Sequence, residues 1–238
     1  MSREKSIKVA QPPDWANRFS HLAQHARHPL LQRFYRAGVI DAHTPLEQVQ
    51  LLAMDLETTG LNPRSDSIVS IGLLPFTLAR IRCGQALYWV IKPSELSHES
   101  VTFHRITHAD IQDAPRLPEV MEKVLEAMAG KIMVVHYRAI ERQFLDQAMR
   151  RYAGESLEFP VIDTMQLEAQ QVRGRGWFDR LFRRQPASIR LADSRARYHL
   201  PPYHAHHALT DALATAELLQ AQVATHYAPS VAVGQLWD

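Results

Sequence analysis

The sequence predicts an α/β fold in which a mixed β-sheet is flanked by helices. Three short apolar runs joined by short connections predict an antiparallel series of strands. After them, apolar runs alternate with amphipathic segments, the pattern of helices and strands that share one sheet. Hydrophobic residues make up 46% of the 238 residues and charged residues 22%, the balance of a folded globular protein.

The first strand is expected over residues 50–55, an apolar run that ends in an acid. A turn rich in Gly, Asn and Pro over residues 60–66 separates it from a second strand at residues 67–76. Three further strands are predicted at residues 86–91, 131–136 and 161–163.

Helices are expected on both sides of this strand series. Asp14 is a candidate cap for the first one, because apolar residues follow it at three- and four-residue spacing. The others are predicted over residues 29–37, 117–129, 140–152, from residue 164 onward, and 208–224.

The chain is expected to divide into a helical N-terminal extension (1–47), one catalytic domain (48–228) and a C-terminal tail (229–238). Residues 172–200 interrupt the alternation and are interpreted as an insertion within the domain. The chain as a whole has a net charge of only +2, yet this insertion holds eight arginines against two aspartates. Aromatic residues are interleaved with the arginines, so the insertion is either a track for a nucleic acid or a solvated loop tethered by its aromatics.

Other function classes are excluded or disfavoured by composition. Cys83 is the only cysteine, which rules out an intrachain disulfide and a Cys-rich zinc site. No stretch approaches the roughly 18 apolar residues of a membrane span. The N-terminus lacks the apolar core of a signal peptide. We therefore expect a soluble cytoplasmic protein without a membrane partner.

A pair of acids ends the first predicted strand. Asp55 and Glu57 are two residues apart, so in an extended strand they point to the same face. Two close carboxylates repel each other unless a proton or a cation lies between them. Mg²⁺ and Mn²⁺ prefer such oxygen ligands. Taken alone, the pair is better explained as two solvated acids at the end of a strand.

Two more acids are expected near helix starts. Glu141 opens a predicted helix after a strand, where an acid can also serve simply to stabilise the helix dipole. Asp211 falls on the first turns of the last predicted helix, and His206 precedes it by five residues.

Together these segments resemble the motifs of the DEDD exonuclease superfamily, in its histidine-containing DEDDh branch, which includes the proofreading subunit of bacterial replicative DNA polymerase. The resemblance covers about residues 48–222, and the order and spacing of the motifs make it specific. The segments that carry it are MDLETTGLNPRSDSIVSIG, VTFHRITHADIQDAP, VVHYRAIERQFL, VIDTMQL and HHALTDALATAEL.

The resemblance implies a ribonuclease H-like fold and a 3′→5′ exonuclease that uses two ions of Mg²⁺ or Mn²⁺. It implies that Asp55 bridges both ions, that Glu57 and Asp211 complete the site of the attacking water, and that Glu141 supports the second ion. His206 is implied as the general base, a role that suits a side chain with an ordinary pKa of about 6.5.

The resemblance also implies a substrate site for the 3′ end of a nucleic acid. Phe144 is implied there too, although it is as readily explained as a core residue. The arginine-rich insertion favours single-stranded substrates, with DNA favoured over RNA. The expected substrate-binding residues are Leu56, Thr58, Thr59, Gly60, His104, Phe144, Arg180, Arg183 and Arg184.

Two alternative functions are compatible with the same motifs. The first is an oligoribonuclease or dinucleotidase that acts on very short RNA, or an enzyme that trims the 3′ ends of RNA. The second is a catalytically weakened nucleic-acid-binding module associated with a polymerase. The N-terminal extension is expected to serve for docking, either to a polymerase partner or to a second copy in a homodimer.

The sequence departs from the family pattern in its second motif and beside His104. Glu141 stands where aspartate is usual, and Tyr137 replaces an asparagine. Asp146 is an alternative acid, but it lies beyond the apolar pair that fixes the register, so Glu141 is preferred. Arg105 replaces a common glycine.

Overall fold

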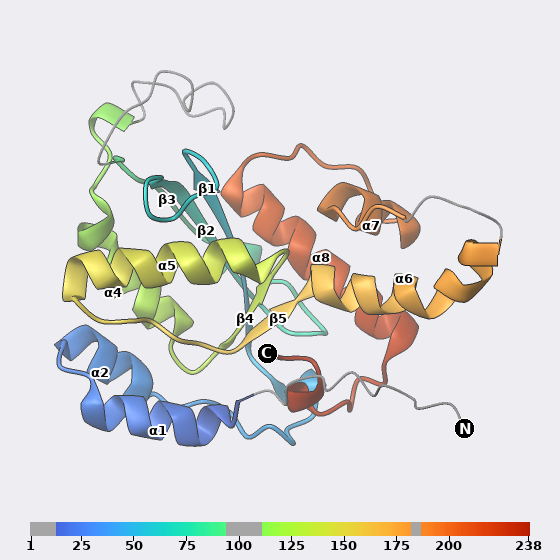
Figure 1. Cartoon of the computed structure of the whole chain (residues 1–238), viewed down its shortest axis with the longest axis horizontal. Helices are drawn as coiled ribbons and strands as arrows, with labels where there is room; N and C mark the ends of the chain where they lie inside the picture. Colours follow the sequence, from blue (N-terminus) through green and yellow to red (C-terminus); the bar gives the residue numbers. More distant parts are fainter. Residues whose placement is uncertain (1–12, 94–110, 182–186) are drawn as a thin grey trace, which may run out of the picture.

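The computed structural model describes residues 13–93, 111–181 and 187–238, and its centre is a five-stranded sheet with the order β3-β2-β1-β4-β5 (Figure 1). The first three strands pair antiparallel, whereas β4 and β5 run parallel to β1. The predicted mixed sheet is thereby confirmed. Its strands are β1 (Leu51–Thr58), β2 (Ile68–Phe76), β3 (Leu87–Val90), β4 (Ile132–Val135) and β5 (Val161–Asp163).

Helices flank the sheet, and every predicted helix is found. Short 3₁₀ turns occur at Leu46–Gln48, Cys83–Gln85 and Val233–Gln235. The helices are α1 (Trp15–His25), α2 (Pro29–Arg36), α4 (Leu117–Met128), α5 (Arg138–Ala153), α6 (Thr164–Leu181), α7 (Leu191–Arg197) and α8 (Ala208–His226).

The described residues of the arginine-rich insertion include two stretches of helix. Helix α6 continues to Leu181, and α7 forms beside α8 (Figure 1). Arg195 is buried and lies 2.8 Å from a carboxylate oxygen of Glu217, while Arg197 lies 2.7 Å from Glu168. These two arginines therefore hold α7 against α8 and α6, and neither belongs to a solvated loop.

The N-terminal extension packs into the same hydrophobic core as the sheet. Phe19, Leu31, Phe34 and Tyr35 of α1 and α2 are all buried and belong to the cluster that contains the strands of the sheet. A charged contact adds to this packing, because Arg18 of α1 pairs with the carboxylate of Glu158.

The last residues of the chain also join this core. The side chain of Trp237 is buried, and its backbone pairs with Ile162 of β5.

Among the described residues, no helix combines the length and the apolar character that a passage through a membrane requires.

Candidate active site

Three acids from two elements meet at one end of the sheet. Asp55 and Glu57 lie on β1, and Asp211 lies in the first turn of α8. One carboxylate oxygen of each lies within 4.8 Å of those of the other two. Glu57 and Asp211 are buried, and Asp55 is half-buried. The two motifs therefore converge on a carboxylate cluster.

Gly72 of β2 allows α8 to come this close. It pairs with Asp55 across the β1–β2 ladder. A Cβ atom at this position would lie 2.5 Å from the carbonyl oxygen of Ala208 and 2.5 Å from the amide nitrogen of Leu209. Only a glycine therefore permits the start of α8 to rest directly on β2. A glycine inside a predicted strand is a sequence signal for such a close approach, but its role was not inferred from the sequence.

Glu141 lies beside this cluster but outside the group of three. It is in the first turn of α5, only 2% exposed, and its Oε2 has no hydrogen-bond partner among the described residues. Burial, and then the charge of Asp163, raise the pKa of its carboxyl group well above the usual value. A buried carboxylate oxygen without a partner is costly unless a ligand satisfies it.

Asp55 experiences the charges of all the other acids. Burial raises its pKa well above the usual value, and the charges of Glu141, Asp211 and Glu57 raise it further, in that order. The charge of Glu141 therefore acts on the centre of the cluster.

Asp146, the alternative acid of the second motif, is used elsewhere. Its carboxylate accepts hydrogen bonds from the Nε of Arg150 at 2.8 Å and from the backbone nitrogen of Leu157 at 3.1 Å. It also accepts one from the hydroxyl of Ser156. These bonds fix the end of α5 to the following chain, so Asp146 has a structural role at this place.

Asp211 is held by the loop before α8. One of its oxygens accepts hydrogen bonds from the backbone nitrogens of His206 at 2.8 Å and His207 at 3.2 Å. Burial raises the pKa of Asp211, as does the charge of Glu57, and these hydrogen bonds oppose the rise. His206 is exposed and has a positive φ of 70°, whereas the ring of His207 stacks on Tyr88 at 4.6 Å.

Tyr203 is a residue of this site that the sequence analysis missed. Its hydroxyl forms a hydrogen bond with the carboxylate of Asp211. Burial, and then the charge of Asp211, raise the pKa of this hydroxyl, which therefore stays protonated and donates. The buried guanidinium of Arg195 lies 5.0 Å over the Tyr203 ring and donates to the carbonyl oxygen of Ala214 at 2.8 Å. No motif around Tyr203 pointed to it.

The turn after β1 is held by internal hydrogen bonds and by close packing around Gly60. The hydroxyl of Thr58 donates to the carbonyl oxygen of Gly60 at 2.6 Å, and the backbone nitrogen of Thr59 donates to the carbonyl oxygen of Ser67 at 2.9 Å. A Cβ atom at Gly60 would lie 2.5 Å from a carboxylate oxygen of Asp66. These contacts fix the backbone conformation of the turn.

The other expected substrate residues have different surroundings. Leu56 is buried on β1, and Phe144 is a core residue, 3% exposed, that also lines a cavity of about 500 Å³ between α4, α5 and the turn after β1. Arg180 lies on α6, but its side chain is outside the described part of the structure. The residues His104, Arg105, Arg183 and Arg184 lie outside the described residues.

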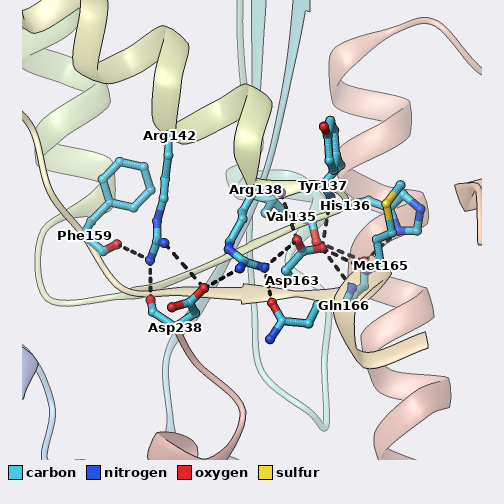
Figure 2. A network of polar contacts seen from close by, with 11 residues as sticks. Val135, His136, Tyr137, Arg138, Arg142, Phe159, Asp163, Met165, Gln166 and Asp238 are labelled. Atoms are coloured by element: carbon cyan, nitrogen blue, oxygen red, sulfur yellow. Dashed lines mark hydrogen bonds and ion pairs between the residues drawn. The ribbon is translucent and has the colours of Figure 1, made fainter. Parts of the chain in front are cut away.

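Asp163 fixes the start of α5, the helix that carries Glu141 (Figure 2). Its two carboxylate oxygens accept the backbone N–H groups of Tyr137 at 3.0 Å and of Arg138 at 3.1 Å. The side chain of Arg138 also contacts Asp163 at 3.3 Å and pairs with Asp238 at 2.6 Å. The N-terminus of α5 is thus tied to the end of β5.

His136 ties Ile189, within the arginine-rich insertion, to the same edge of the sheet. One ring nitrogen lies 2.8 Å from the hydroxyl of Thr164, and the other lies 3.0 Å from the carbonyl oxygen of Ile189. Burial lowers the pKa of His136 to about 4, against the opposing charges of Asp163 and Glu168. The ring is therefore neutral at physiological pH and donates to Ile189.

The comparisons identify the family. The model of the exonuclease family named RNase T matches residues 52–219, so the chain belongs to this family. The chain is 29% identical over 176 residues to a DNA polymerase III PolC-type from Thermotoga petrophila, covering 72% of this chain but only 12% of that relative. It is 28% identical over 181 residues to the DNA polymerase III subunit epsilon of Treponema pallidum, covering 76% and 79% of the two chains.

The fold is shared with solved exonuclease structures. The nuclease domain of 3′hExo, described as a DEDDh family member bound to rAMP, superposes with a TM-score of 0.60 at 13% identity and covers 79% of this chain and 96% of that one. The ribonuclease H-like fold and the family resemblance expected from the motifs are thereby confirmed.

The donors of the carboxylate cluster fit a hard divalent cation. All are carboxylate oxygens, the ligand type that Mg²⁺ and Mn²⁺ prefer. Their mutual repulsion, which raises the pKa values of Asp55 and Asp211, is relieved when a cation binds between them. The unpartnered oxygen of Glu141 is a further donor at the edge of this cluster.

Proposed function

We propose that this protein is a 3′→5′ exonuclease that removes nucleotides from the 3′ end of single-stranded nucleic acid, with DNA favoured over RNA. The observation that carries the proposal is the convergence of Asp55, Glu57 and Asp211, whose ligand oxygens lie within 4.8 Å of one another. The DNA polymerase III names of the relatives support a DNA substrate.

The acids would hold two ions of Mg²⁺ or Mn²⁺. Asp55 would contribute to both sites, Glu57 and Asp211 would complete one of them, and Glu141 would support the other. When bound, such a pair activates a water molecule and neutralises charge on the scissile phosphate and on the leaving oxygen. His206 takes the proton from the attacking water. The hydrogen bond from its backbone nitrogen to Asp211 keeps this residue next to the cluster. Its side chain is exposed.

The terminal nucleotide would bind beside the turn after β1. Backbone and side-chain contacts to this nucleotide would come from Leu56, Thr58, Thr59 and Gly60. The hydrogen bond and the close packing within the turn hold these residues in position. The cavity lined by Phe144 opens next to this turn. We assign His104 to the same nucleotide site.

The assay that tests the proposal uses the purified protein with end-labelled substrates. Single-stranded DNA, duplex DNA, RNA and a dinucleotide are each incubated with Mg²⁺ or Mn²⁺. A ladder that shortens from the 3′ end of single-stranded DNA is expected. Degradation from the 5′ end, or no degradation in any arm, contradicts the proposal. Cleavage of the dinucleotide alone identifies a short-substrate enzyme instead.

The glutamate of the second motif gives a separate prediction. Glu141→Asp is expected to remain active with a changed ratio of Mg²⁺- to Mn²⁺-supported rates, because the carboxylate is retained on a shorter stem. Glu141→Ala is expected to lose most activity. Initial rates at several metal concentrations measure both effects. Asp146→Ala is the matched control, and if it proves to be the inactive variant, the register of this motif is wrong.

The general base gives a second prediction. His206→Ala is expected to lower the rate of the chemical step by about 10²–10⁴-fold, the contribution of a positioned base. Single-turnover rates across pH measure this, and the acidic limb of the profile should flatten. His204→Ala is the control, since His204 is exposed and lies two residues away, whereas His207 stacks on Tyr88. Equal losses at His204 and His206 would indicate a disturbed loop.

The arginine-rich segment gives a third prediction. If Arg180, Arg183 and Arg184 bind phosphates, the triple change to Gln should weaken binding of long single strands. The slope of log affinity against log salt should fall by roughly 0.7 for each phosphate that is no longer neutralised. Cleavage of a dinucleotide should hardly change, because it carries one phosphodiester. The exposed Arg36 of α2 supplies the control variant. An unchanged salt slope rules out the track.

A further inference from the structure

Tyr137 has a backbone conformation that is unfavourable for its side chain. Its φ is 94° and its ψ is 70°, in the left-handed region. A bulky residue there is strained, and such strain concentrates at functional sites. The side chain is 48% exposed, so little burial of the ring offsets the strain.

The hydrogen bonds around Tyr137 fix its backbone conformation but do not require a tyrosine side chain. Asp163 accepts the N–H groups of Tyr137 and Arg138 (Figure 2), and the carbonyl oxygen of Tyr137 accepts the N–H of Ile140. None of these contacts uses the side chain of Tyr137. Glycine or asparagine would adopt the same conformation at a lower cost. The phenol ring is therefore not needed to build the turn.

Residue 137 lies at the end of the sheet where the acids gather. Strand β4 runs parallel to β1 with Val134 paired to Ala53, so two residues further on the strands lead to His136 and Asp55. Tyr137 follows directly, and Glu141 lies one turn later on α5. Figure 2 shows the ring of Tyr137 pointing away from Asp163, on the side opposite Asp238.

We propose that Tyr137 is a substrate-binding residue whose ring stacks on a nucleobase of the single strand next to the carboxylate cluster. The proposal rests on the proposed exonuclease function and adds a contact to it. An exposed aromatic ring beside a phosphodiester-cleaving site offers a flat apolar surface, and every base has a face that can stack on it. The contact would strengthen binding without selecting a base sequence.

The test combines affinity and stability for Tyr137→Asn and Tyr137→Phe. Binding of a labelled single-stranded oligodeoxynucleotide is measured in EDTA, which prevents metal-dependent cleavage, and each variant is melted. Tyr137→Asn is expected to bind roughly 5- to 150-fold more weakly, the range for loss of one stacked base. Its melting temperature should rise, because asparagine relieves the left-handed strain. Tyr137→Phe should retain most of the affinity.

An exposed ring on a different helix supplies the control. His21 is exposed on α1, where it stacks on His25, and His21→Asn should leave the affinity unchanged. Wild-type affinity in Tyr137→Asn, or an affinity loss accompanied by a lower melting temperature, would overturn the proposal. With 2-aminopurine at successive positions from the 3′ end, quenching that depends on Tyr137 identifies the stacked base. Failure of the wild-type protein to shorten any strand would instead refute the exonuclease function.

Discussion

Asp55→Asn is expected to abolish hydrolysis, with a loss of roughly 10³-fold or more, while it stabilises the metal-free protein. The loss follows because Asp55 is one of the three acids whose ligand oxygens lie within 4.8 Å of one another, and we propose it as a ligand of both ions. The gain follows from its raised pKa. When a carboxyl group has a higher pKa in the folded state than in the unfolded state, the folded protein loses stability as the pH rises above the unfolded pKa of about 4. The side chain of asparagine carries no charge, so the Asp55→Asn variant does not lose this stability.

Two measurements check this result. Melting curves in EDTA should show the variant above wild type at neutral pH, and the difference should vanish near pH 4. Added Mg²⁺ should stabilise wild type but not the variant, because only wild type has the full ligand set. Glu126→Gln, which changes an exposed acid on α4, is the control. Near-wild-type turnover in Asp55→Asn would refute the metal assignment.

Gly72→Ala is expected to damage both stability and activity through a single methyl group. Its Cβ would lie 2.5 Å from backbone atoms at the start of α8, which cannot move as a flexible side chain can. Overpacking of this kind costs about 1–3 kcal/mol. The helix must shift away from β1 and β2, and Asp211 moves with it, so hydrolysis should fall even at temperatures where the variant remains folded.

Chemical denaturation and initial rates on the same preparations separate the two effects. Gly84→Ala is the matched control, because a Cβ there meets no heavy atom within 4 Å. It should be neutral in both assays. A Gly72→Ala protein that is folded and fully active would show that the precise approach of α8 does not matter for the site.

The sequence predicted the sheet well because strands depend on local patterns. An apolar run ending in Asp-Leu-Glu is a strand with two carboxylates on one face, whatever surrounds it. Glu141 could be preferred over Asp146 because Phe144 and Leu145 fix the helical register, and both are buried in the structure.

The features that were missed depend on contacts between distant residues. Arg195 and Arg197 looked like members of a basic surface, yet Glu217 and Glu168 pair with them from other helices. The hydrogen bond of Tyr203 to Asp211 likewise depends on how the chain folds back before α8. Sequence spacing carries no information about such pairs.

The burial of α1 and α2 in the common core bears on how this protein can be dissected. A fragment restricted to the family match at residues 52–219 would strip Phe19, Phe34 and Tyr35 from the core and Trp237 from the edge of β5. Apolar surface so uncovered favours aggregation, and domains have only about 5–15 kcal/mol of net stability to lose. The recognisable nuclease sequence is therefore shorter than the unit that folds, and expression vectors should retain both flanks.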